Sequence, residues 1–252
     1  MLKSFVSAYT LYLFGVEKMP GEQEFLTLEP GENSQKQAIC DLIGGAKAVF
    51  FDHDDTLVEA MKAKWAQHKY IARKFYGKKL TDDELRVHWG APLSSLLKLL
   101  YGTHHLDIAM SYNIAIRDRF PKLLFKDTLS TMKFLRKAGK KVGIVTATSL
   151  SSLQNDFETL GISKQLFDYI QTEDDTIFHK PDPRVFEPTL QWLAKHRIRP
   201  SEVVYVGDHL KDLIAAKGAG LHFIGVSTGV ISAAEFAKHR ALHVPSLASL
   251  LV

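Results

Sequence analysis

The fold depends on Val49-Phe50-Phe51-Asp52-His53-Asp54-Asp55-Thr56-Leu57, where an apolar run leads directly into three carboxylates and a hydroxyl group. The run Ala48 to Phe51 is too short for a helix and too continuous for an exposed strand, so it predicts a buried strand of a parallel sheet. In open α/β sheets, ligands bind beyond the carboxyl ends of the strands. We therefore expect these carboxylates to belong to a ligand site.

The composition is ordinary for a globular protein, with 252 residues, 46% of them hydrophobic and 24% charged. The net charge of +4 suits anionic substrates, but the basic residues are scattered and no recognition motif accompanies them, so we expect no nucleic-acid partner. The single cysteine, Cys40, fits a reducing compartment. Phe5 to Val16 is apolar but shorter than the about 20 residues that span a bilayer. We expect a cytoplasmic protein without a membrane partner.

The chain changes character twice along its length. Residues 1–44 contain two Pro-Gly turn signals and end at Gly44-Gly45, which predicts an N-terminal appendage whose role the sequence leaves open. From about residue 60 to 124 the pattern is wholly helical. It begins with the periodic segment Glu59 to Tyr76 and continues with a capping box at Thr81-Asp82-Asp83-Glu84. Further helices are expected at 93–101 and 106–120.

Strands and helices alternate in the remainder of the chain. We expect strands at 142–146, 169–170, 203–206 and 222–226, and helices at 128–138, 151–160, 183–196 and 210–219. This alternation predicts an α/β fold, a Rossmann-like doubly wound parallel sheet with helices on both faces. Residues 45–59 and 125–252 form this sheet domain, and an all-helical insertion at 60–124 interrupts it after the first strand.

Polar residues at four strand ends resemble the motifs of the haloacid dehalogenase superfamily, in its phosphatase branch with phosphoglycolate phosphatase-like members. DHDDT at 52–56 matches the family's DxDxT, and Thr146 closes a hydrophobic strand as the family's Thr or Ser does. Lys180 lies in a KPDP context, and GDHLKD at 207–212 matches GDxxxD. The resemblance covers residues 46 to about 230. It implies that the helical insertion is a mobile cap that closes over the site and selects the substrate.

The four motifs supply what phosphoryl transfer requires: a nucleophile, a proton source, a cation and donors for the phosphate oxygens. Asp52 is ionised at neutral pH and suits the nucleophile that forms an aspartyl-phosphate. Asp54 is the natural acid for the leaving alkoxide and the base for the attacking water. Thr146 offers a hydroxyl group to the phosphate, with Ala147-Thr148 opening the next helix. Lys180 offsets negative charge between nucleophile and phosphate.

Several carboxylates around a dianionic phosphate would repel it unless a hard cation such as Mg²⁺ is bound. The resemblance implies that the ligands are Asp52, the backbone carbonyl of Asp54, and Asp208. Asp212 lies one helical turn after Asp208 and either supports the metal site or binds the metal directly. The predicted metal residues are therefore Asp52, Asp54, Asp208 and Asp212.

Two residues depart from the commonest family pattern. Asp55 replaces the usual glycine, and because Asp tolerates a positive φ better than most residues, we interpret it as a loop variant and not as a third catalytic acid. His209 replaces a small hydroxyl residue, and we expect its ring to face solvent. The ring of His53 is expected to pack away from the site.

The leading prediction is a Mg²⁺-dependent phosphatase that hydrolyses a small phosphorylated metabolite, either phosphoglycolate-like or a sugar phosphate monoester, as a monomer or homodimer. A phosphosugar mutase shares all four motifs, and an inactive binding protein on the same fold is a further alternative. A dehalogenase would not need Asp54. A phosphonatase would use a cap lysine such as Lys62 or Lys64 as a Schiff base, and Asp54 argues against it as well. Substrate selection is expected around Trp89-Gly90-Ala91-Pro92.

Overall fold

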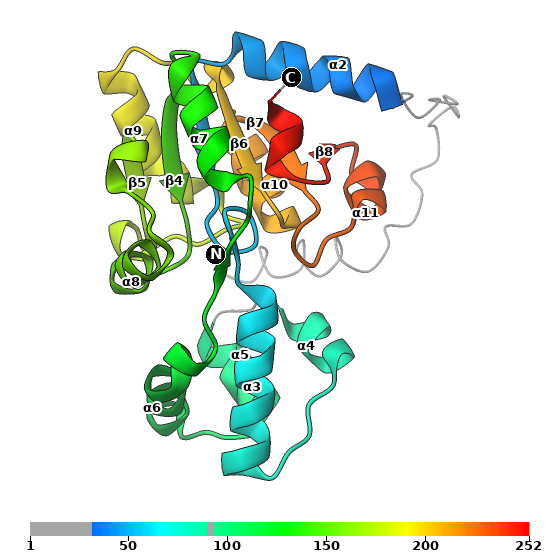
Figure 1. Ribbon diagram of the computed structural model, residues 1–252, viewed down its shortest axis with the longest axis vertical. Helices are drawn as coiled ribbons and strands as arrows, with labels where there is room; N and C mark the ends of the chain where they lie inside the picture. Colours follow the sequence, from blue (N-terminus) through cyan, green and yellow to red (C-terminus); the bar gives the residue numbers. More distant parts are fainter. Residues whose placement is uncertain (1–31, 90–92, 252) are drawn as a thin grey trace, which may run out of the picture. The chain divides into compact units, whose positions relative to one another are not determined.

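The computed structural model of the chain describes residues 32–89 and 93–251 (Figure 1). The expected substrate loop at 90–92 and the apolar segment Phe5 to Val16 lie outside the described residues. The chain divides into two units, residues 1–34 and residues 35–252, and the second contains the sheet and the helical insertion. No helix among the described residues is long and apolar enough to cross a membrane.

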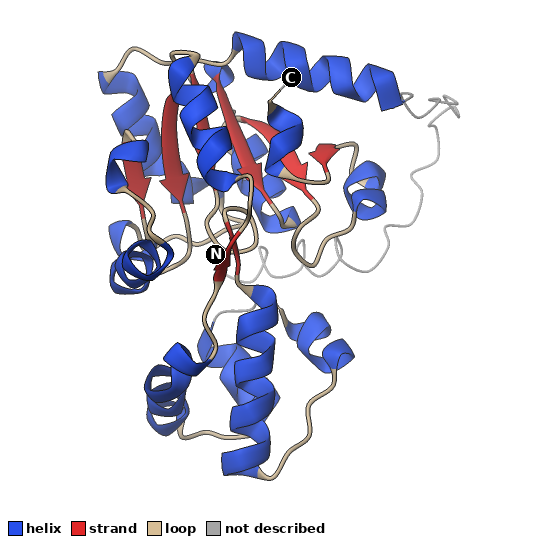
Figure 2. Cartoon of the chain, viewed as in Figure 1, coloured by secondary structure: helices blue, strands red, loops and turns tan. Residues whose placement is uncertain are grey.

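A parallel sheet with strand order β5-β4-β1-β6-β7-β8 forms the centre of this unit, and Figure 2 shows its arrowheads pointing the same way. The chain order reverses at β1, which pairs with β4 on one side and with β6 on the other. Ligands bind at such a switch point in open α/β sheets. The strands are β1 (Ala48–Phe51), β4 (Lys141–Val145), β5 (Tyr169–Gln171), β6 (Val203–Gly207), β7 (His222–Val226) and β8 (Leu242–Val244).

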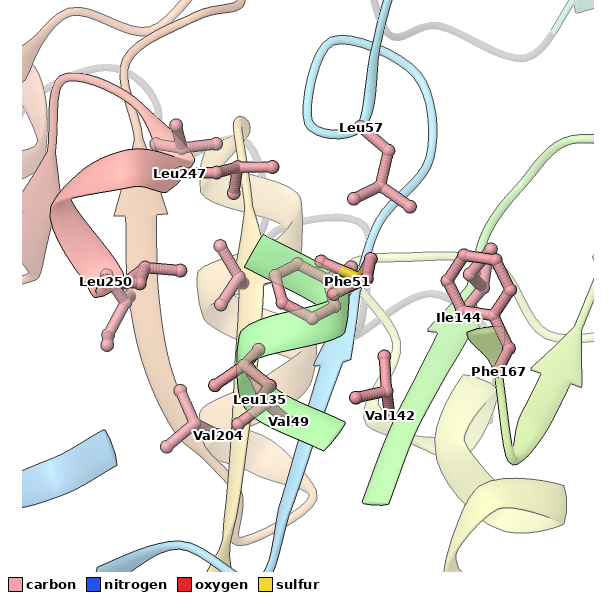
Figure 3. Packing of buried hydrophobic residues seen from close by; sticks show 14 of the residues in the cluster. Val49, Phe51, Leu57, Leu135, Val142, Ile144, Phe167, Val204, Leu247 and Leu250 are labelled. Carbon is pink, nitrogen blue, oxygen red and sulfur yellow. The ribbon is translucent and has the colours of Figure 1, made fainter. Parts of the chain in front are cut away.

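Successive side chains of β1 point to opposite faces of the sheet, and both faces are covered. Val49 and Phe51 join one hydrophobic cluster, in which Leu135 of α7 packs over the sheet (Figure 3). Ala48 and Phe50 join a second cluster on the other face. The first face is covered by α2 (Glu32–Gly45), α7 (Thr128–Lys137) and α8 (Leu150–Leu160), and the second by α9 (Glu187–Lys195), α10 (Leu210–Gly218) and α11 (Ala233–Lys238). The predicted doubly wound α/β fold is confirmed.

A helical insertion follows β1 and has its own hydrophobic cluster. Its helices are α3 (Met61–Tyr76), α4 (Asp82–His88), α5 (Leu93–Tyr101) and α6 (Leu106–Ile116). Two short antiparallel strands, β2 (Val58–Glu59) and β3 (Leu123–Leu124), connect the insertion to the sheet domain. The predicted capping box is present, because the Thr81 hydroxyl accepts from the Glu84 N–H at 3.2 Å and the Glu84 carboxylate accepts from the Thr81 N–H. The exact domain boundaries stay a prediction.

The structure differs from the sequence expectations at several boundaries. Helix α2 packs Ile39 and Ile43 into the first hydrophobic cluster, so the part of the expected appendage that lies in the second unit belongs to the core. Strand β8 and helix α11 were not anticipated. The helices expected at 106–120 and 183–196 each contain a 3₁₀ turn. The 3₁₀ turns are η1 (Arg117–Arg119), η2 (Lys164–Leu166), η3 (Glu173–Asp175), η4 (Pro183–Phe186), η5 (Pro200–Glu202) and η6 (Leu247–Leu250).

Candidate active site

Asp52 is fixed at the carboxyl end of β1, because its backbone N–H donates to the Val206 carbonyl at 2.9 Å and so extends the pairing with β6. Its Oδ1 lies 3.0 Å from the Lys180 ammonium group. That oxygen is buried, and the contact places a positive charge directly against it. Burial raises the pKa of Asp52, although Lys180 opposes the shift.

Lys180 is held by three groups. Its ammonium lies 2.7 Å from Asp212 Oδ1, in addition to the contact with Asp52, and it donates to the Tyr205 hydroxyl. Tyr205 in turn donates to the Val145 carbonyl at 2.7 Å. Burial would lower the pKa of Lys180, but the carboxylates of Asp212 and Asp52 outweigh it and raise the pKa. The lysine therefore stays charged beside Asp52.

Asp208 and Asp212 complete an acidic cluster with Asp52. Carboxylate oxygens of the three residues all lie within 4.8 Å of one another. Burial and the neighbouring charges of Asp212 and Asp52 raise the pKa of Asp208 well above its ordinary value. Asp212 is already engaged, because its Oδ1 faces Lys180 and its Oδ2 accepts from the His209 N–H at 3.1 Å.

This donor set fits a hard divalent cation. The three carboxylates have oxygens within 4.8 Å of one another and repel each other, and such an ion would offset that repulsion. The backbone of Gly229 lies against the Asp208 carboxylate, and a methyl group added at Gly229 would overlap Asp208 Oδ2. The acidic cluster can hold a metal, with Asp52 and Asp208 as its less engaged members.

Asp54 lies in a second charged group beside the first. Its carboxylate contacts the Lys64 ammonium from α3, the Lys122 ammonium at 2.6 Å and the Thr148 hydroxyl at 3.2 Å. Lys122 also lies 2.6 Å from Asp156 Oδ2. Burial would raise the pKa of Asp54, but Lys122 and Lys64 more than offset it and hold the pKa well below its ordinary value.

Sequence reasoning did not anticipate this ion-pair network. Lys64 stands out in the sequence only as a Schiff-base lysine of the alternative phosphonatase, and Lys122, Asp156 and Tyr205 belong to none of the four motifs. The available signal is position, because Lys64 and Lys122 lie near the two ends of the helical insertion, where the chain leaves and rejoins the sheet domain. The expectation that the His53 ring packs away from the site is wrong, because the ring contacts Asp156 at 2.9 Å and its nitrogen lies within 4.8 Å of a carboxylate oxygen of Asp54.

Thr146 follows β4 directly and is buried. Its backbone N–H donates to the Gln171 carbonyl at 3.0 Å, and its hydroxyl oxygen accepts from the Thr148 N–H at 3.1 Å. The hydroxyl proton is therefore available to an acceptor in the site. Helix α8 begins at Leu150 with Ser149 as its N-cap, so Ala147-Thr148 lie just before this helix and do not open it.

The two departures from the family pattern have different outcomes. Asp55 has a φ of 58°, and its Oδ1 accepts from the backbone N–H groups of Ala60 at 2.9 Å and Met61 at 2.7 Å. Asp55 thus supports the loop and the start of α3, as a loop variant would. Burial raises the pKa of Asp55 to about 6. The expectation that His209 faces solvent is wrong, because its ring is half-buried and accepts from the Lys211 N–H at 3.1 Å to cap α10.

The structure brings the predicted residues to one edge of the sheet, beyond β1, β4 and β6. Residues 49–226 match the family of haloacid dehalogenase-like hydrolases. The chain belongs to this family. A Clostridium perfringens protein named as a candidate pyrophosphatase PpaX is 30% identical over 183 residues, which cover 71% of this chain and 83% of that protein.

Solved structures agree with this assignment. A candidate haloacid dehalogenase-like hydrolase from Bacteroides fragilis is 27% identical with a TM-score of 0.64, covering 77% of this chain and 93% of that chain. A candidate beta-phosphoglucomutase from Thermotoga maritima is 22% identical with a TM-score of 0.68, covering 81% of this chain and 96% of that chain, and shows the shared fold alone. The predicted family and the predicted class of enzyme, a hydrolase, are confirmed.

Proposed function

We propose that this member of the haloacid dehalogenase-like family is a Mg²⁺-dependent phosphatase. It hydrolyses a small phosphorylated metabolite, phosphoglycolate-like or a sugar phosphate monoester, through an aspartyl-phosphate. One observation carries the proposal: the Asp52 carboxylate lies 3.0 Å from the Lys180 ammonium, and its oxygens lie within 4.8 Å of those of Asp208 and Asp212. A relative named as a pyrophosphatase also supports phosphoryl chemistry. The single cysteine favours a cytoplasmic setting.

The chain's own residues account for both halves of the reaction. A carboxylate oxygen of Asp52 attacks phosphorus, the ester P–O bond breaks, and its electron pair leaves with the oxygen, which receives a proton from Asp54. Asp54 then takes a proton from water as that water attacks the phosphorus of the aspartyl-phosphate. Phosphate departs and Asp52 is restored. Lys180 and the Thr146 hydroxyl hold the non-bridging phosphate oxygens.

Asp52, Asp208 and the backbone carbonyl of Asp54 are the proposed ligands of Mg²⁺. The metal supplies positive charge that lets an anionic phosphate approach two ionised carboxylates. Asp212 orients Lys180 through the 2.7 Å contact and stabilises the start of α10, so we assign it a supporting role. The proposed role of Gly229 is to leave room for the Asp208 carboxylate.

Hydrolysis of phosphoglycolate and of glucose 1-phosphate with and without Mg²⁺ tests the proposal. Asp52→Asn should lower the rate of phosphate release at least about 10³-fold, because an amide is a poor nucleophile toward phosphorus. Asp118→Asn serves as the matched control, since this carboxylate is 87% exposed and pairs only with Arg117 among the described residues. Normal phosphate release by Asp52→Asn would refute the phosphatase, and conversion of glucose 1-phosphate into an isomer without phosphate release would establish the mutase.

A further inference from the structure

Two ammonium groups converge on one carboxylate at the edge of the site. Lys64 from α3 contacts Asp54 Oδ2, and Lys122, which immediately precedes β3, lies 2.6 Å from Asp54 Oδ1. Lys122 is shared with Asp156, whereas Asp54 is the only ion-pair partner of Lys64 among the described residues. The Lys122 side chain is 14% exposed and that of Lys64 is 36% exposed. Lys64 is therefore the more accessible of the two cations.

These cations lie on the side of the site from which the leaving group departs. In the proposed reaction Asp54 protonates the departing oxygen, so groups that contact its carboxylate are neighbours of that oxygen. Lys180 belongs to the other side, where it pairs with Asp52 and Asp212. The positive charge of Lys64 and Lys122 is thus separate from the charge that binds the transferred phosphoryl group.

The ammonium of Lys64 can accept a further partner. It has three N–H donors, and Asp54 is the only carboxylate within ion-pair distance of it among the described residues. A charged group of the substrate beside the scissile oxygen would meet the ammonium groups of both Lys64 and Lys122. A neutral group would displace water from these charges without supplying an opposite charge, which is costly.

We propose that Lys64 and Lys122 select substrates whose leaving group is itself an anion, carrying a carboxylate or a second phosphate beside the scissile oxygen. This inference rests on the proposed function and narrows it from small phosphorylated metabolites to those with an anionic leaving group. Lys64 comes from the helical insertion, so the insertion supplies the specificity contact. Lys122 orients Asp54 as well as binding the anion.

Two pairs of probes isolate the leaving-group charge. Phosphoglycolate and 2-hydroxyethyl phosphate are esters of similar size that differ in a carboxylate. Their non-hydrolysable phosphonate counterparts are 3-phosphonopropionate and 3-hydroxypropylphosphonate. Lys64→Met keeps the aliphatic length and removes the charge, and Lys64→Arg keeps the charge. Lys62→Met is the matched control on the same helix, because Lys62 is 76% exposed and pairs with Glu59.

In Mg²⁺, the wild type should favour phosphoglycolate over 2-hydroxyethyl phosphate in kcat/KM by at least about tenfold. Lys64→Met should reduce this ratio about tenfold, because the charge contact is lost for one substrate only. Lys64→Arg should retain most of the preference, and Lys62→Met all of it. An unchanged ratio in Lys64→Met would overturn the inference, whatever happens to the absolute rates.

Calorimetric binding of the two phosphonates in Mg²⁺ separates this inference from the proposed function. The wild type should bind 3-phosphonopropionate more tightly than 3-hydroxypropylphosphonate, and Lys64→Met should bring the two dissociation constants within about threefold of each other. If neither ester is hydrolysed, the phosphatase assignment fails while the binding ratio still decides the role of Lys64. Equal binding of both phosphonates by the wild type would refute the anion selectivity.

Discussion

Asp52 and Asp54 are two residues apart and have opposite pKa shifts. Burial raises the pKa of Asp52, and the ammonium groups of Lys122 and Lys64 outweigh burial and lower the pKa of Asp54. Asp52 must be ionised to act as a nucleophile, and Asp54 must be protonated to act as a general acid. Bound ligands must therefore lower the pKa of Asp52 and raise the pKa of Asp54. A cation against Asp52 lowers its pKa, and an anionic leaving group that engages Lys64 raises that of Asp54. The proposed metal and the proposed substrate class thus prepare the two carboxylates for their roles.

Gly229 gives a prediction at the scale of one residue. A methyl group at this position would overlap Asp208 Oδ2, so Gly229→Ala should displace the carboxylate from the proposed metal site. We expect the Mg²⁺ concentration for half-maximal activity to rise about 10-fold or more, as is typical when support for a metal ligand is lost. The measurement is a Mg²⁺ titration of phosphate release.

Gly44→Ala provides the control for this substitution. A methyl group at Gly44 meets no atom within 4 Å, so the Mg²⁺ dependence of this variant should equal that of the wild type. An unchanged Mg²⁺ dependence in Gly229→Ala would show that Asp208 does not bind the metal in the position described.

The sequence allowed some of these residues to be predicted and not others. Asp52, Thr146 and Asp208 each follow a hydrophobic strand. Because the carboxyl ends of parallel strands lie at the same edge of the sheet, the sequence predicts that these three residues lie close together. The contacts of Lys122 and Asp156 with the site depend on how a distant loop and a helix pack beside β1. No local pattern encodes that packing.

At the scale of an element, Asp55 connects the acidic loop to the first helix of the insertion. Its Oδ1 accepts from two backbone N–H groups at the start of α3, which satisfies donors that a helix leaves unpaired at its N-terminus. The carboxylate is nevertheless buried close to other carboxylates, and its pKa is raised to about 6. The contact therefore stabilises the helix start while the ionised form of Asp55 destabilises the loop.

In metal-free buffer, the difference in unfolding free energy between Asp55→Asn and the wild type should depend on pH. The pKa rises from 3.8 in the unfolded reference to about 6 in the folded protein. Stability from the neutral carboxyl is therefore complete below about pH 4 and lost as the pH rises through 6. Asparagine keeps the acceptor without the charge, so the variant should exceed the wild type by up to about 3 kcal/mol in unfolding free energy at pH 7 and match it near pH 4.

Urea denaturation of both proteins between pH 4 and 7.5 checks this expectation. Asp118→Asn, at an exposed carboxylate, should track the wild type at every pH. A stability difference between Asp55→Asn and the wild type that stays constant over this range would contradict the raised pKa.

Secondary structure was predictable where elements are long or strongly patterned. The helix α5 and the strand β7 match the expected ranges at both ends, because apolar periodicity and glycine or polar boundaries define them. Strand β8 is three residues long and β2 only two, and such short pairings depend on the neighbouring strand more than on their own residues. The 3₁₀ turn η4 arises where Pro183 and the Asp182 cap begin a helix that only later becomes α-helical.

At the scale of the whole molecule, the site gathers carboxylates whose mutual repulsion opposes folding. The carboxylates of Asp52, Asp208 and Asp212 lie close together, the Lys180 ammonium pairs with Asp52 and Asp212, and the neighbouring carboxylates raise the pKa of Asp208. Net folding stability is only about 5–15 kcal/mol, so a change in this repulsion alters the stability measurably. A bound divalent cation should therefore stabilise the entire fold.

Metal removal tests this coupling. The unfolding free energy in Mg²⁺ at about 100 times its dissociation constant should exceed that in EDTA by about 2.7 kcal/mol, because the ion binds only the folded protein. Asp208→Asn should lose most of this increment. Guanidinium denaturation with and without Mg²⁺ measures both, and an equal Mg²⁺ increment in Asp208→Asn would place the metal elsewhere.

The central claim is that Asp52 forms a covalent bond to phosphorus. The most direct measurement is rapid acid quenching of the enzyme during turnover of phosphoglycolate in Mg²⁺, followed by mass spectrometry of the proteolysed chain. We predict a phosphoryl adduct on Asp52 in the wild type and none in Asp52→Asn. Turnover without an adduct on Asp52, or an adduct on another residue, would contradict the account.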